Sequence, residues 1–491
     1  MKYYSFLFRR HTLLTLVVLL LVITPLGNLT PGQAAGDNLP TSRFTLVGNP
    51  NFNPNSLSPE MRQWYDRLWK AINSPSLYPD PDSIASSGDV YRMGRTLNAH
   101  ITALLAAFRS TGDLKLLDEV DRLMELAKIQ LKDYNGDGYL NWRYLFDSAS
   151  VYYNNDKHQM DEMLTHSMVA EVAYALRANA QYKSSYGQHA DFWTNYLVNH
   201  FLAKWQKRGG IDKSLAHPYA NFMRMYYYLY KLTGNSAYLN EANRRAGVLN
   251  GMMVDQKTSR GVGFTWDHRV PNMGESALGC QPTVYAVLTV MAFQDMALEG
   301  FSYYANDAYM KKYAATFRDV ILVYGTDKLA GRVCGGSGEY VTEGFEKYLL
   351  GAAPGLAAWD DTGVIASINS QAFSRYDNAT NPTKIFISAY SLQALAAKTV
   401  AGTNPTPTKT PTVAPTKTPT PGPTKTPTVA PTKTPTVAPT KVNTATPAPT
   451  NPPPTGGSRV TSNLQVLYTF EEGSGTTVRD MAGSNDPLDL T

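Results

Sequence analysis

The stretch TGDLKLLDE, residues 111–119, decides the fold because it recurs as TGNSAYLNE at residues 233–241. In each copy a glycine follows an apolar helical pattern, and a short polar turn opens the next helix. A third variant is NDAYM at residues 306–310. The first two copies are 122 residues apart. That offset corresponds to two units of about 61 residues, and a period of this size indicates repeated helical hairpins.

Helical periodicity dominates the sequence around these hinges. Between Arg92 and Phe108, apolar residues recur at the i, i+3 and i+4 positions of a buried helix face. The same pattern returns in residues 114–131, 163–180, 192–205, 216–232, 238–252, 284–298, 309–323 and 385–397. Since β-type alternation is scarce, residues 37–400 predict an all-α domain of five or six hairpins.

The hinges resemble those of secreted (α/α)6-type carbohydrate-active enzymes, in which Thr-Gly-Asp-x-x-Tyr-Leu turns are frequent. The resemblance implies a closed toroid of helical hairpins, and an open solenoid is the alternative. Solenoid repeats are shorter and more regular, whereas the irregular loops at 255–281, 324–345 and 351–384 suit the walls of a cleft. We therefore expect an (α/α)6-type toroid that acts as the catalytic domain.

The first 36 residues have the three-part pattern of a secretory signal peptide. Basic residues precede an apolar run from Leu13 to Ile23, and small residues follow at 32–36. The run is shorter than a spanning helix needs, although an uncleaved N-terminal anchor is the alternative. We expect a secreted, extracellular protein with no membrane span after cleavage.

The formal net charge of +5 does not indicate a polyanionic partner. Residues 401–458 hold five lysines and no acid or arginine, and the first 36 residues hold three basic residues and no acid, so the rest carries −3. Hydrophobic residues make up 43% of the chain, which excludes a wholly disordered protein. We expect no nucleic-acid partner and a monomer that binds a polysaccharide substrate.

Two further segments follow the helical domain. Residues 401–458 are almost wholly Thr, Pro, Lys, Val and Ala, a composition that favours extended polyproline II and predicts a disordered linker. Beyond it, LQVLYTF at 464–470 and EEGSGTTVRD at 471–480 resemble the opening of a laminin-G-like, concanavalin-type jelly roll. The resemblance implies that residues 459–491 are the start of an incomplete β jelly-roll module that binds carbohydrate or protein.

Cys280 and Cys334 lie in glycine-rich, loop-like surroundings. In an oxidising compartment such a pair is more often bridged than free, and two buried thiols are the alternative. We expect a disulfide. Neither cysteine is expected to act as a nucleophile, because the sequence places no histidine beside them.

The segment from residue 216 carries the strongest candidate site. His217, Asn221, Arg224 and Tyr228 fall at i, i+4, i+7 and i+11, so they share one helix face. Imidazole, amide, guanidinium and phenol groups together suit a cleft that binds an acidic sugar. The alternative is a helix whose tyrosines pack in the core.

These residue types resemble the catalytic set of polysaccharide lyases with (α/α) toroids. Such enzymes cleave uronic-acid polymers, for example alginate or glucuronan, by β-elimination: one group neutralises the carboxylate, a base removes the C5 proton and an acid protonates the leaving oxygen. The resemblance implies that His217 and Asn221 neutralise the carboxylate, Tyr226 or Tyr228 transfers the proton, and Arg224 binds a subsite.

Further candidates lie near predicted helix starts or in a loop. His166 is a catalytic candidate, and the expected substrate-binding residues are Arg92, Arg95, Asn98, Trp266, His268 and Arg269. The alternative to a lyase is a glycoside hydrolase of the same fold, which needs paired carboxylates; acids in loops are Asp267, Glu275, Glu343, Asp360 and Asp361. A third interpretation is a non-catalytic glycan-binding surface protein.

Residues 133–141 resemble an EF-hand-type calcium loop. Its expected ligands are Asp133, Asn135, Asp137, Tyr139 and Asn141. Position 12 is Tyr144 instead of glutamate, so the bidentate ligand is missing unless Asp147 replaces it. A plain polar turn is the alternative. We expect no cofactor to be required for the chemistry, and a calcium ion here would be structural.

Overall fold

All three hinge sequences are helix boundaries in the computed structural model. Gly112 and Gly234 end helices with left-handed φ angles of 72° and 69°. The following residue, Asp113 or Asn235, caps the next helix with a side-chain oxygen that accepts a backbone N–H at 3.1 or 3.0 Å. Asn306 caps a helix in the same way at 2.9 Å. The hinge predictions are therefore confirmed.

The structure describes residues 45–403, except for 75, 76, 78, 272, 323–327, 337–341, 344–351 and 376–382. The predicted signal peptide and jelly-roll start lie outside these residues. So does the predicted linker, apart from residues 401–403, which belong to the last described helix.

Within the described residues, the main helices form pairs of one inner and one outer element. The inner elements are α4 (Asn98–Thr111), α6 (Gln159–Ala178), α9 (Ala216–Thr233), α11 (Thr283–Leu298), η5 (Ala353–Trp359) and α15 (Thr383–Thr403). Their outer partners, in the same order, are α5 (Leu114–Lys128), α7 (Ser184–Tyr196), α10 (Ser236–Gly251), α12 (Asp307–Thr316), α14 (Val364–Arg375) and α1 (Pro59–Ile72).

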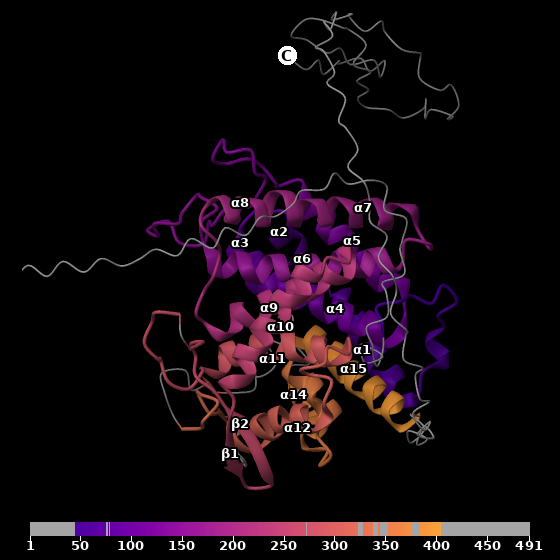
Figure 1. Cartoon of the computed structure of the whole chain (residues 1–491). Coiled ribbons are helices and arrows are strands. Elements are labelled where there is room, and N and C mark those ends of the chain that lie inside the picture. Colours follow the sequence, from indigo (N-terminus) through magenta and orange to yellow (C-terminus); the bar gives the residue numbers. More distant parts are fainter. Residues whose placement is uncertain are drawn as a thin grey trace, which may run out of the picture. The chain divides into compact units, whose positions relative to one another are not determined.

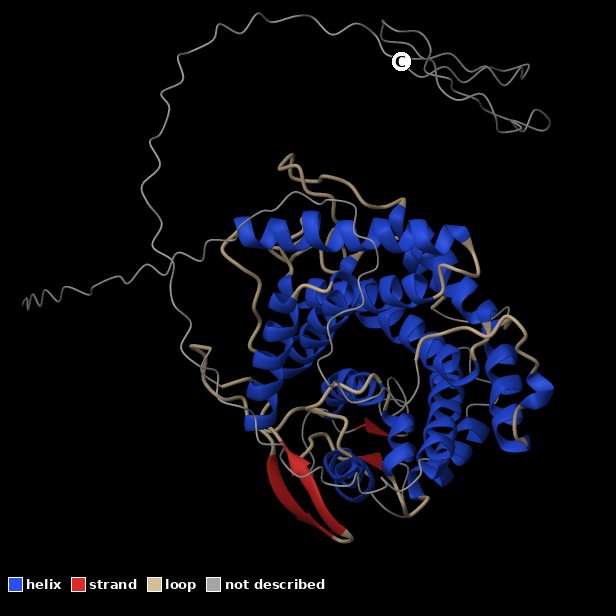
Figure 2. Cartoon of the chain, turned by 45° about the vertical axis from the view of Figure 1, so that its right-hand side comes forward, coloured by secondary structure: helices blue, strands red, loops and turns tan. Residues whose placement is uncertain are grey.

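The inner elements close into a ring. Each packs against the next along the chain, and α15 packs against α4. Because α15 also pairs with α1, the first and last long helices of the described chain complete one repeat together. Figures 1 and 2 show the helices arranged in two layers around the ring. The domain is an all-α (α/α)6 toroid, as predicted.

Shorter elements extend or connect these helices. Helix α3 (Val90–Arg92) and the π-helical turn η2 (Met93–Leu97) lead into α4; η3 (Leu197–Leu202) and α8 (Ala203–Lys207) continue α7; and η4 (Phe317–Ile321) continues α12. Two more are η1 (Pro54–Ser56) and α2 (Pro81–Ala85). An antiparallel hairpin of β1 (Val254–Thr258) and β2 (Gly261–Thr265) projects from the domain (Figure 2), and β3 (Lys328–Leu329) pairs with β4 (Thr342–Glu343).

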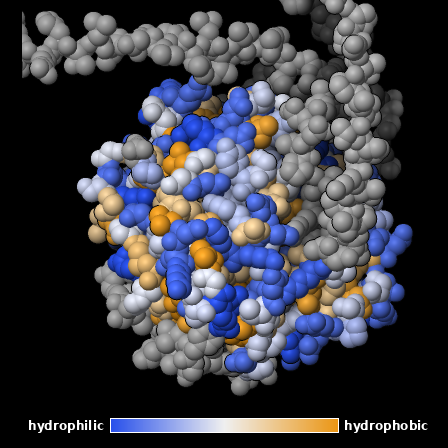
Figure 3. Space-filling view, turned by 60° about the horizontal axis from the view of Figure 1, so that its bottom comes forward, coloured by the Kyte–Doolittle hydropathy of each residue, from blue (hydrophilic) through white to orange (hydrophobic). Residues whose placement is uncertain are grey.

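Burial separates the two layers. In the inner helix α4 every residue from Asn98 to Arg109 is buried, whereas the outer helix α5 buries one stripe and exposes the other face. On the surface drawn in Figure 3, apolar residues are scattered among hydrophilic ones. Among the described helices, none combines the length and apolar character needed to cross a bilayer.

Candidate functional site

The inner helices α4, α6, α9 and α11 run parallel, because contacts join their corresponding ends. Near the N-terminal ends, Arg95 of η2 bonds to Asp161 in the first turn of α6. Near the C-terminal ends, Arg109 of α4 bonds to Glu299, which follows α11. The N-terminal ends therefore share one rim of the toroid.

Six side chains meet at this rim, and we call them the rim cluster: Arg95, His158, Asp161, His217, His268 and Tyr285. Nε of Arg95 lies 3.0 Å from Oδ1 of Asp161, and its guanidinium carbon lies 5.9 Å from the ring centre of Tyr285. The ring of His217 stacks on Tyr285 at 4.6 Å and on His268 at 5.7 Å. Contacts thus run without interruption from Asp161 to His268.

A glycine allows Arg95 to reach Asp161. A Cβ atom at Gly94 would lie 2.8 Å from the backbone oxygen of Asp161 and 2.9 Å from Oγ1 of Thr165, so only glycine permits this approach of η2 to α6. The π-helical turn that carries Arg95 is a feature that occurs often at functional sites.

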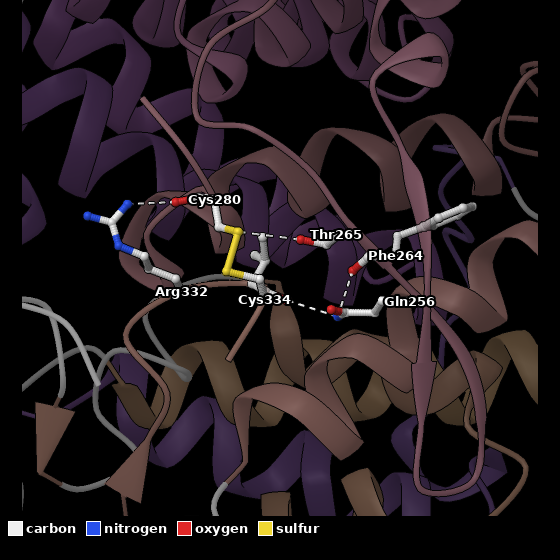
Figure 4. The surroundings of a disulfide bond; sticks show 7 residues. Gln256, Phe264, Thr265, Cys280, Arg332 and Cys334 are labelled. Atoms are coloured by element: carbon white, nitrogen blue, oxygen red, sulfur yellow. Dashed lines mark hydrogen bonds between the residues drawn. A yellow bond between two sulfur atoms is a disulfide. The ribbon is translucent and has the colours of Figure 1, made fainter. Parts of the chain in front are cut away.

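A disulfide and short backbone ladders hold the other half of the rim cluster. The predicted bond between Cys280 and Cys334 is present (Figure 4), and it ties residues 279–283, which lead into α11, to residues 330–334. The backbone N–H of His268 donates to the oxygen of Gly279 at 2.8 Å. The oxygen of His268 in turn accepts the N–H of Ala216, the first residue of α9. The starts of α9 and α11 are therefore fixed relative to His268.

Burial keeps His217 and His268, two of the three histidines of the rim cluster, neutral near pH 7. Burial lowers the pKa of His217 well below its ordinary value, and Arg95 and His268 lower it further. Burial also lowers the pKa of His268 to about 4. Although burial opposes the charge of Arg95, the carboxylate of Asp161 raises its pKa.

Several buried polar atoms of the rim cluster have no hydrogen-bond partner among the described residues. They are both ring nitrogens of His217, Nδ1 of His268 and Oδ2 of Asp161. Nδ1 of His158 lies 2.9 Å from Oδ2 of Asp161, but the angles do not make a hydrogen bond. Buried polar atoms without partners are places where a ligand or water can complete the set. Such atoms also occur elsewhere in the described core, for example in Tyr304 and Tyr313.

The predicted helix-face residues do not all lie at this rim. His217 does, but Arg224 lies deeper, in a buried ionic cluster that we define as Arg109, Glu171, Arg224, Asp295 and Glu299. Nη1 of Arg224 lies 3.1 Å from Glu171 and 2.5 Å from Asp295. Tyr228 bonds to Arg109 at 3.2 Å. From His217 to Tyr228 the shared face runs about 16 Å along the helix, which explains the difference in depth.

Two predicted amides connect helices beneath the rim. Nδ2 of Asn221 donates to the backbone oxygens of His217 and Leu288, and its Oδ1 accepts Nη2 of Arg224. Asn98 is buried and its Oδ1 lies 3.4 Å from Nη2 of Arg224. These placements suit helix packing and do not support carboxylate neutralisation by Asn221 or a subsite role for Asn98 and Arg224.

Other predicted site residues face away from the rim cluster. His166 stacks on Phe201 at 3.6 Å and bonds to Tyr196, on the side of the outer helix α7. Tyr226 packs toward α10, where the guanidinium carbon of Arg245 lies 5.7 Å from its ring. Roles in proton transfer for His166, Tyr226 and Tyr228 are therefore not supported by their positions.

Three loop or helix-start residues surround the rim cluster or lie behind it. Trp266 is buried and donates from Nε1 to Gln281, so its ring is no exposed platform for a sugar. Arg92 is exposed, 3.8 Å from Asp89, and Arg269 pairs with Glu275 at 3.1 Å. Both arginines lie at the edge of the rim with an acid beside them.

The predicted calcium ligands do not converge. The carboxylate of Asp133 accepts backbone N–H groups of its own loop, and Asn141 is buried with its amide bonded to Glu162. Asn135 donates to Asp156, whereas Asp137 pairs with Arg208 at 2.7 Å. Tyr139 donates its N–H to Asp137. Since Arg208 also pairs with Asp156, a guanidinium provides the positive charge here, and the geometry does not support the calcium prediction.

Within the described part of the chain, one group of three side chains brings metal-ligand atoms close together. Oxygen atoms of Asp121 and Glu125 on α5 and a ring nitrogen of His189 on α7 lie within 4.8 Å of one another. His189 already bonds to Asp121 at 2.7 Å, and Lys128 pairs with Glu125 at 3.0 Å. These existing ion pairs account for the group without a metal.

The loop acids proposed for a hydrolase are separated. Asp267 is half-buried next to His268, and its Oδ1 accepts the N–H groups of Arg269 and Leu278. Glu275 bonds to Ser214, and Asp361 pairs with Lys311 at the surface. Asp360 bonds to Arg318 and to backbone N–H groups at the start of α14. The side chain of Glu343 lies outside the described residues.

Sequence reasoning missed Asp161, His158 and the part played by Tyr285. Each lies at or just before the first turn of an inner helix, the position that also holds His217. That common position was the available signal. A hollow of about 420 Å³, lined by Trp69, Asn73 and Arg122 among others, lies elsewhere, on α1 and α5.

The chain is similar to several solved structures. Neither models of protein families nor curated proteins match the chain. Among solved structures, the GH76A α-1,6-mannanase of Salegentibacter sp. HEL1_6 is 13% identical over 68% of this chain and 99% of its own, with a TM-score of 0.37. The glycoside hydrolase family 76 mannosidase Bt3792 of Bacteroides thetaiotaomicron VPI-5482 is 10% identical over 70% and 100%, with a TM-score of 0.33. Likenesses of this size carry no argument about the site, whose interpretation rests on its own geometry.

Proposed function

We propose that this protein is a secreted glycoside hydrolase that cleaves a neutral polysaccharide at the rim cluster. The observation that carries the proposal is the balance of charge there. Arg95 is paired with Asp161, the ring of His158 lies beside the same carboxylate, and His217 and His268 are neutral near pH 7, so the described rim cluster offers no cation without an acid beside it. A uronic-acid polymer would need such a cation, whereas a neutral sugar does not.

The charges around the rim cluster are also balanced by opposite charges. Arg92 lies beside Asp89, and Arg269 pairs with Glu275. Asp267 and Arg332 act on His268 with opposite signs. Neutral surroundings with stacked aromatic rings suit the apolar faces and hydroxyl groups of an uncharged sugar.

Hydrolysis requires one carboxylate that acts as nucleophile or base and a second carboxyl that donates a proton. Asp161 suits the first role, because Arg95 and the N-terminal turn of α6 stabilise its negative charge while Oδ2 has no hydrogen-bond donor among the described residues. We assign the second role to Asp267, the loop acid next to His268 at the other end of the cluster. Movement of the partly exposed side chains of Arg95 and His158 would open Asp161 to substrate.

One observation favours β-elimination as the second candidate function. Neutral His217, whose ring nitrogens have no partner among the described residues, stacks on Tyr285 within reach of Arg95. If a uronate displaced Asp161 from Arg95, imidazole and phenol would remain for proton transfer.

Export is part of the proposal. The N-terminal pattern supports it, and the Cys280–Cys334 disulfide fits an oxidising compartment. No solved or curated relative bears on this point.

A screen of the full chain separates the candidates. The panel contains neutral polymers (soluble β-glucan, xylan and α-1,6-mannan, the last named for the solved structures above) and uronic-acid polymers (alginate, glucuronan and pectate). Reducing ends and the ultraviolet absorbance of unsaturated products are followed together. We expect reducing ends without absorbance on a neutral polymer. A rise in both signals on a uronate polymer would establish the lyase, and binding without cleavage would favour the non-catalytic glycan-binding protein.

A further inference from the structure

An aromatic pair lies next to the rim cluster and takes no part in the proposed chemistry. The rings of Tyr91 and Phe146 stack with their centres 3.8 Å apart and 16° between their planes. Phe146 is 57% exposed, an unfavourable state for a large apolar ring that packs on only one side. Phe146 belongs to the loop between α5 and α6, whereas Tyr91 belongs to α3.

One buried carboxylate holds the two segments together. Oδ1 of Asp89 accepts the N–H of Tyr91 at 3.1 Å and the N–H of Leu145, the neighbour of Phe146, at 3.0 Å. The backbone of Val90 also donates to the oxygen of Arg143 at 2.8 Å. The aromatic pair is therefore prearranged by hydrogen bonds that do not involve its own rings.

The pair is continuous with the rim cluster. The guanidinium carbon of Arg95 lies 5.0 Å from the ring centre of Tyr91, and Arg95 is the partner of Asp161. A second path runs from Tyr91 to Tyr144 at 6.0 Å and from Tyr144 to His158 at 4.4 Å. A polymer bound at Asp161 would therefore meet the aromatic pair next.

We propose that Tyr91 and Phe146 form a distal subsite on which one neutral sugar unit of the polysaccharide stacks. The inference rests on the proposed function and goes further, because it makes activity depend on chain length. An exposed aromatic face binds the C–H face of a sugar, and such contacts at an interface are typically worth a several-fold change in affinity when the ring is removed. Short oligosaccharides that end before the subsite gain nothing from it.

The test compares Phe146→Ala with Val151→Ala in the full chain. Val151 is an apolar residue of the same loop and is 85% exposed, so it controls for a change in surface hydrophobicity. Affinity of each variant for the three neutral polymers is measured by affinity gel electrophoresis. The kcat/KM is measured on the polymer that the wild type cleaves and on its di- to hexasaccharides.

We expect Phe146→Ala to weaken binding and to lower kcat/KM about five- to tenfold on the polymer and longer oligosaccharides. On the shortest cleaved oligosaccharide it stays within about twofold, and Val151→Ala stays within about twofold throughout. If Phe146→Ala and Val151→Ala have equal effects on binding and kcat/KM with the polymer, the subsite proposal is wrong and the hydrolase proposal is unaffected. If the protein cleaves nothing but Phe146→Ala weakens its binding to a polymer, the hydrolase proposal is wrong and the aromatic subsite is retained. If the wild type neither binds nor cleaves any neutral polymer, both are wrong.

Discussion

The buried ionic cluster is formed by α4, α6, α9 and α11 with the residue that follows α11, and the rim cluster lies at the N-terminal ends of the same helices and in the segments beside them, yet the two clusters arrange their polar groups differently. The buried ionic cluster brings two arginines and three acids into direct contact, for example Arg224 with Glu171 and Asp295. The rim cluster contains one arginine–aspartate ion pair, three imidazoles and a phenol, and both ring nitrogens of His217, Nδ1 of His268 and Oδ2 of Asp161 have no hydrogen-bond partner among the described residues. In the buried ionic cluster, Nε of Arg109 and Oε2 of Glu299 lack a partner there.

On helix α9 this difference distinguishes a residue that stabilises the fold from a residue that is a candidate for function. Polar groups that bond to one another across helices hold the ring together, and replacing one leaves an uncompensated charge. Buried polar groups without partners cost free energy on folding, and they remain available to a ligand or water. On α9, His217 belongs to the second kind and Arg224 to the first, although they lie only two turns apart on one face.

The largest expected effect comes from breaking the buried ionic cluster. Arg224→Met removes the guanidinium that bonds to both Glu171 and Asp295, so the free energy of unfolding should fall by about 3–5 kcal/mol. Denaturant unfolding of the full chain measures the change. The control is Arg244→Met, which removes an exposed pair with Glu241 and should cost less than about 1 kcal/mol. Similar losses in the two variants would contradict the contrast between core and surface.

Removal of the disulfide tests how the rim is held. Cys280→Ser with Cys334→Ser opens a crosslink between residues 54 positions apart. Unfolding free energy should fall by about 2–4 kcal/mol, and KM should rise more than kcat falls because the starts of α9 and α11 lose their anchor. An unchanged denaturation midpoint together with an unchanged KM would show that the backbone ladders suffice without the disulfide.

These predictions also show what the sequence could reveal. Caps at Asp113 and Asn235 are local signals, so the hinges and the toroid were predictable. The helix-face pattern of His217, Asn221, Arg224 and Tyr228 predicts which side of the helix they share but not their depth in the toroid. Of these four residues, only His217 lies at the rim. Asp161 was hidden because its partner Arg95 is 66 residues away, and an acid in the first turn of a helix is common.

The two clusters should respond to pH in opposite directions: a falling pH destabilises the fold through His268, and a rising pH destabilises it through Glu171. For His268 the pKa falls from its ordinary 6.5 to about 4 in the fold, so its contribution to stability is complete above pH 6.5 and is lost as the pH falls toward 4. Burial and the charge of Asp295 raise the pKa of Glu171 from 4.5 to about 8, so its contribution is complete below pH 4.5 and is lost as the pH rises to 8.

Unfolding free energies measured from pH 4 to pH 9 check both signs. His268→Gln should reduce the loss of unfolding free energy between pH 6.5 and 4 by about 2–3 kcal/mol. Glu171→Gln should reduce the loss of unfolding free energy between pH 4.5 and 8. The two pH windows overlap between pH 4.5 and 6.5, where their opposite slopes cancel, so wild-type stability should be highest there. A profile that neither variant alters would mean that other groups control the pH dependence.

The smallest expected effect is that of closing the space between η2 and α6. Gly94→Ala places a Cβ against the backbone oxygen of Asp161, which should cost about 1–2 kcal/mol and displace Arg95. Gly187→Ala on α7 is the control, since its Cβ would meet only the Cβ of Ala180 at an ordinary 3.5 Å. The comparison is made by thermal unfolding and by kcat/KM on the cleaved polymer. Loss of activity in both variants would remove the argument for a close approach at Gly94.

The most direct test of the central claim measures kcat/KM and denaturant unfolding for Asp161→Asn beside Glu171→Gln on the polymer that the wild type cleaves. We predict that Asp161→Asn remains folded but loses at least about a thousandfold in kcat/KM, equivalent to about 4 kcal/mol of barrier. Glu171→Gln should keep kcat/KM within about threefold, because it lies in the buried ionic cluster. Activity retained by Asp161→Asn, or lost only with Glu171→Gln, would contradict the assignment of the rim cluster as the active site.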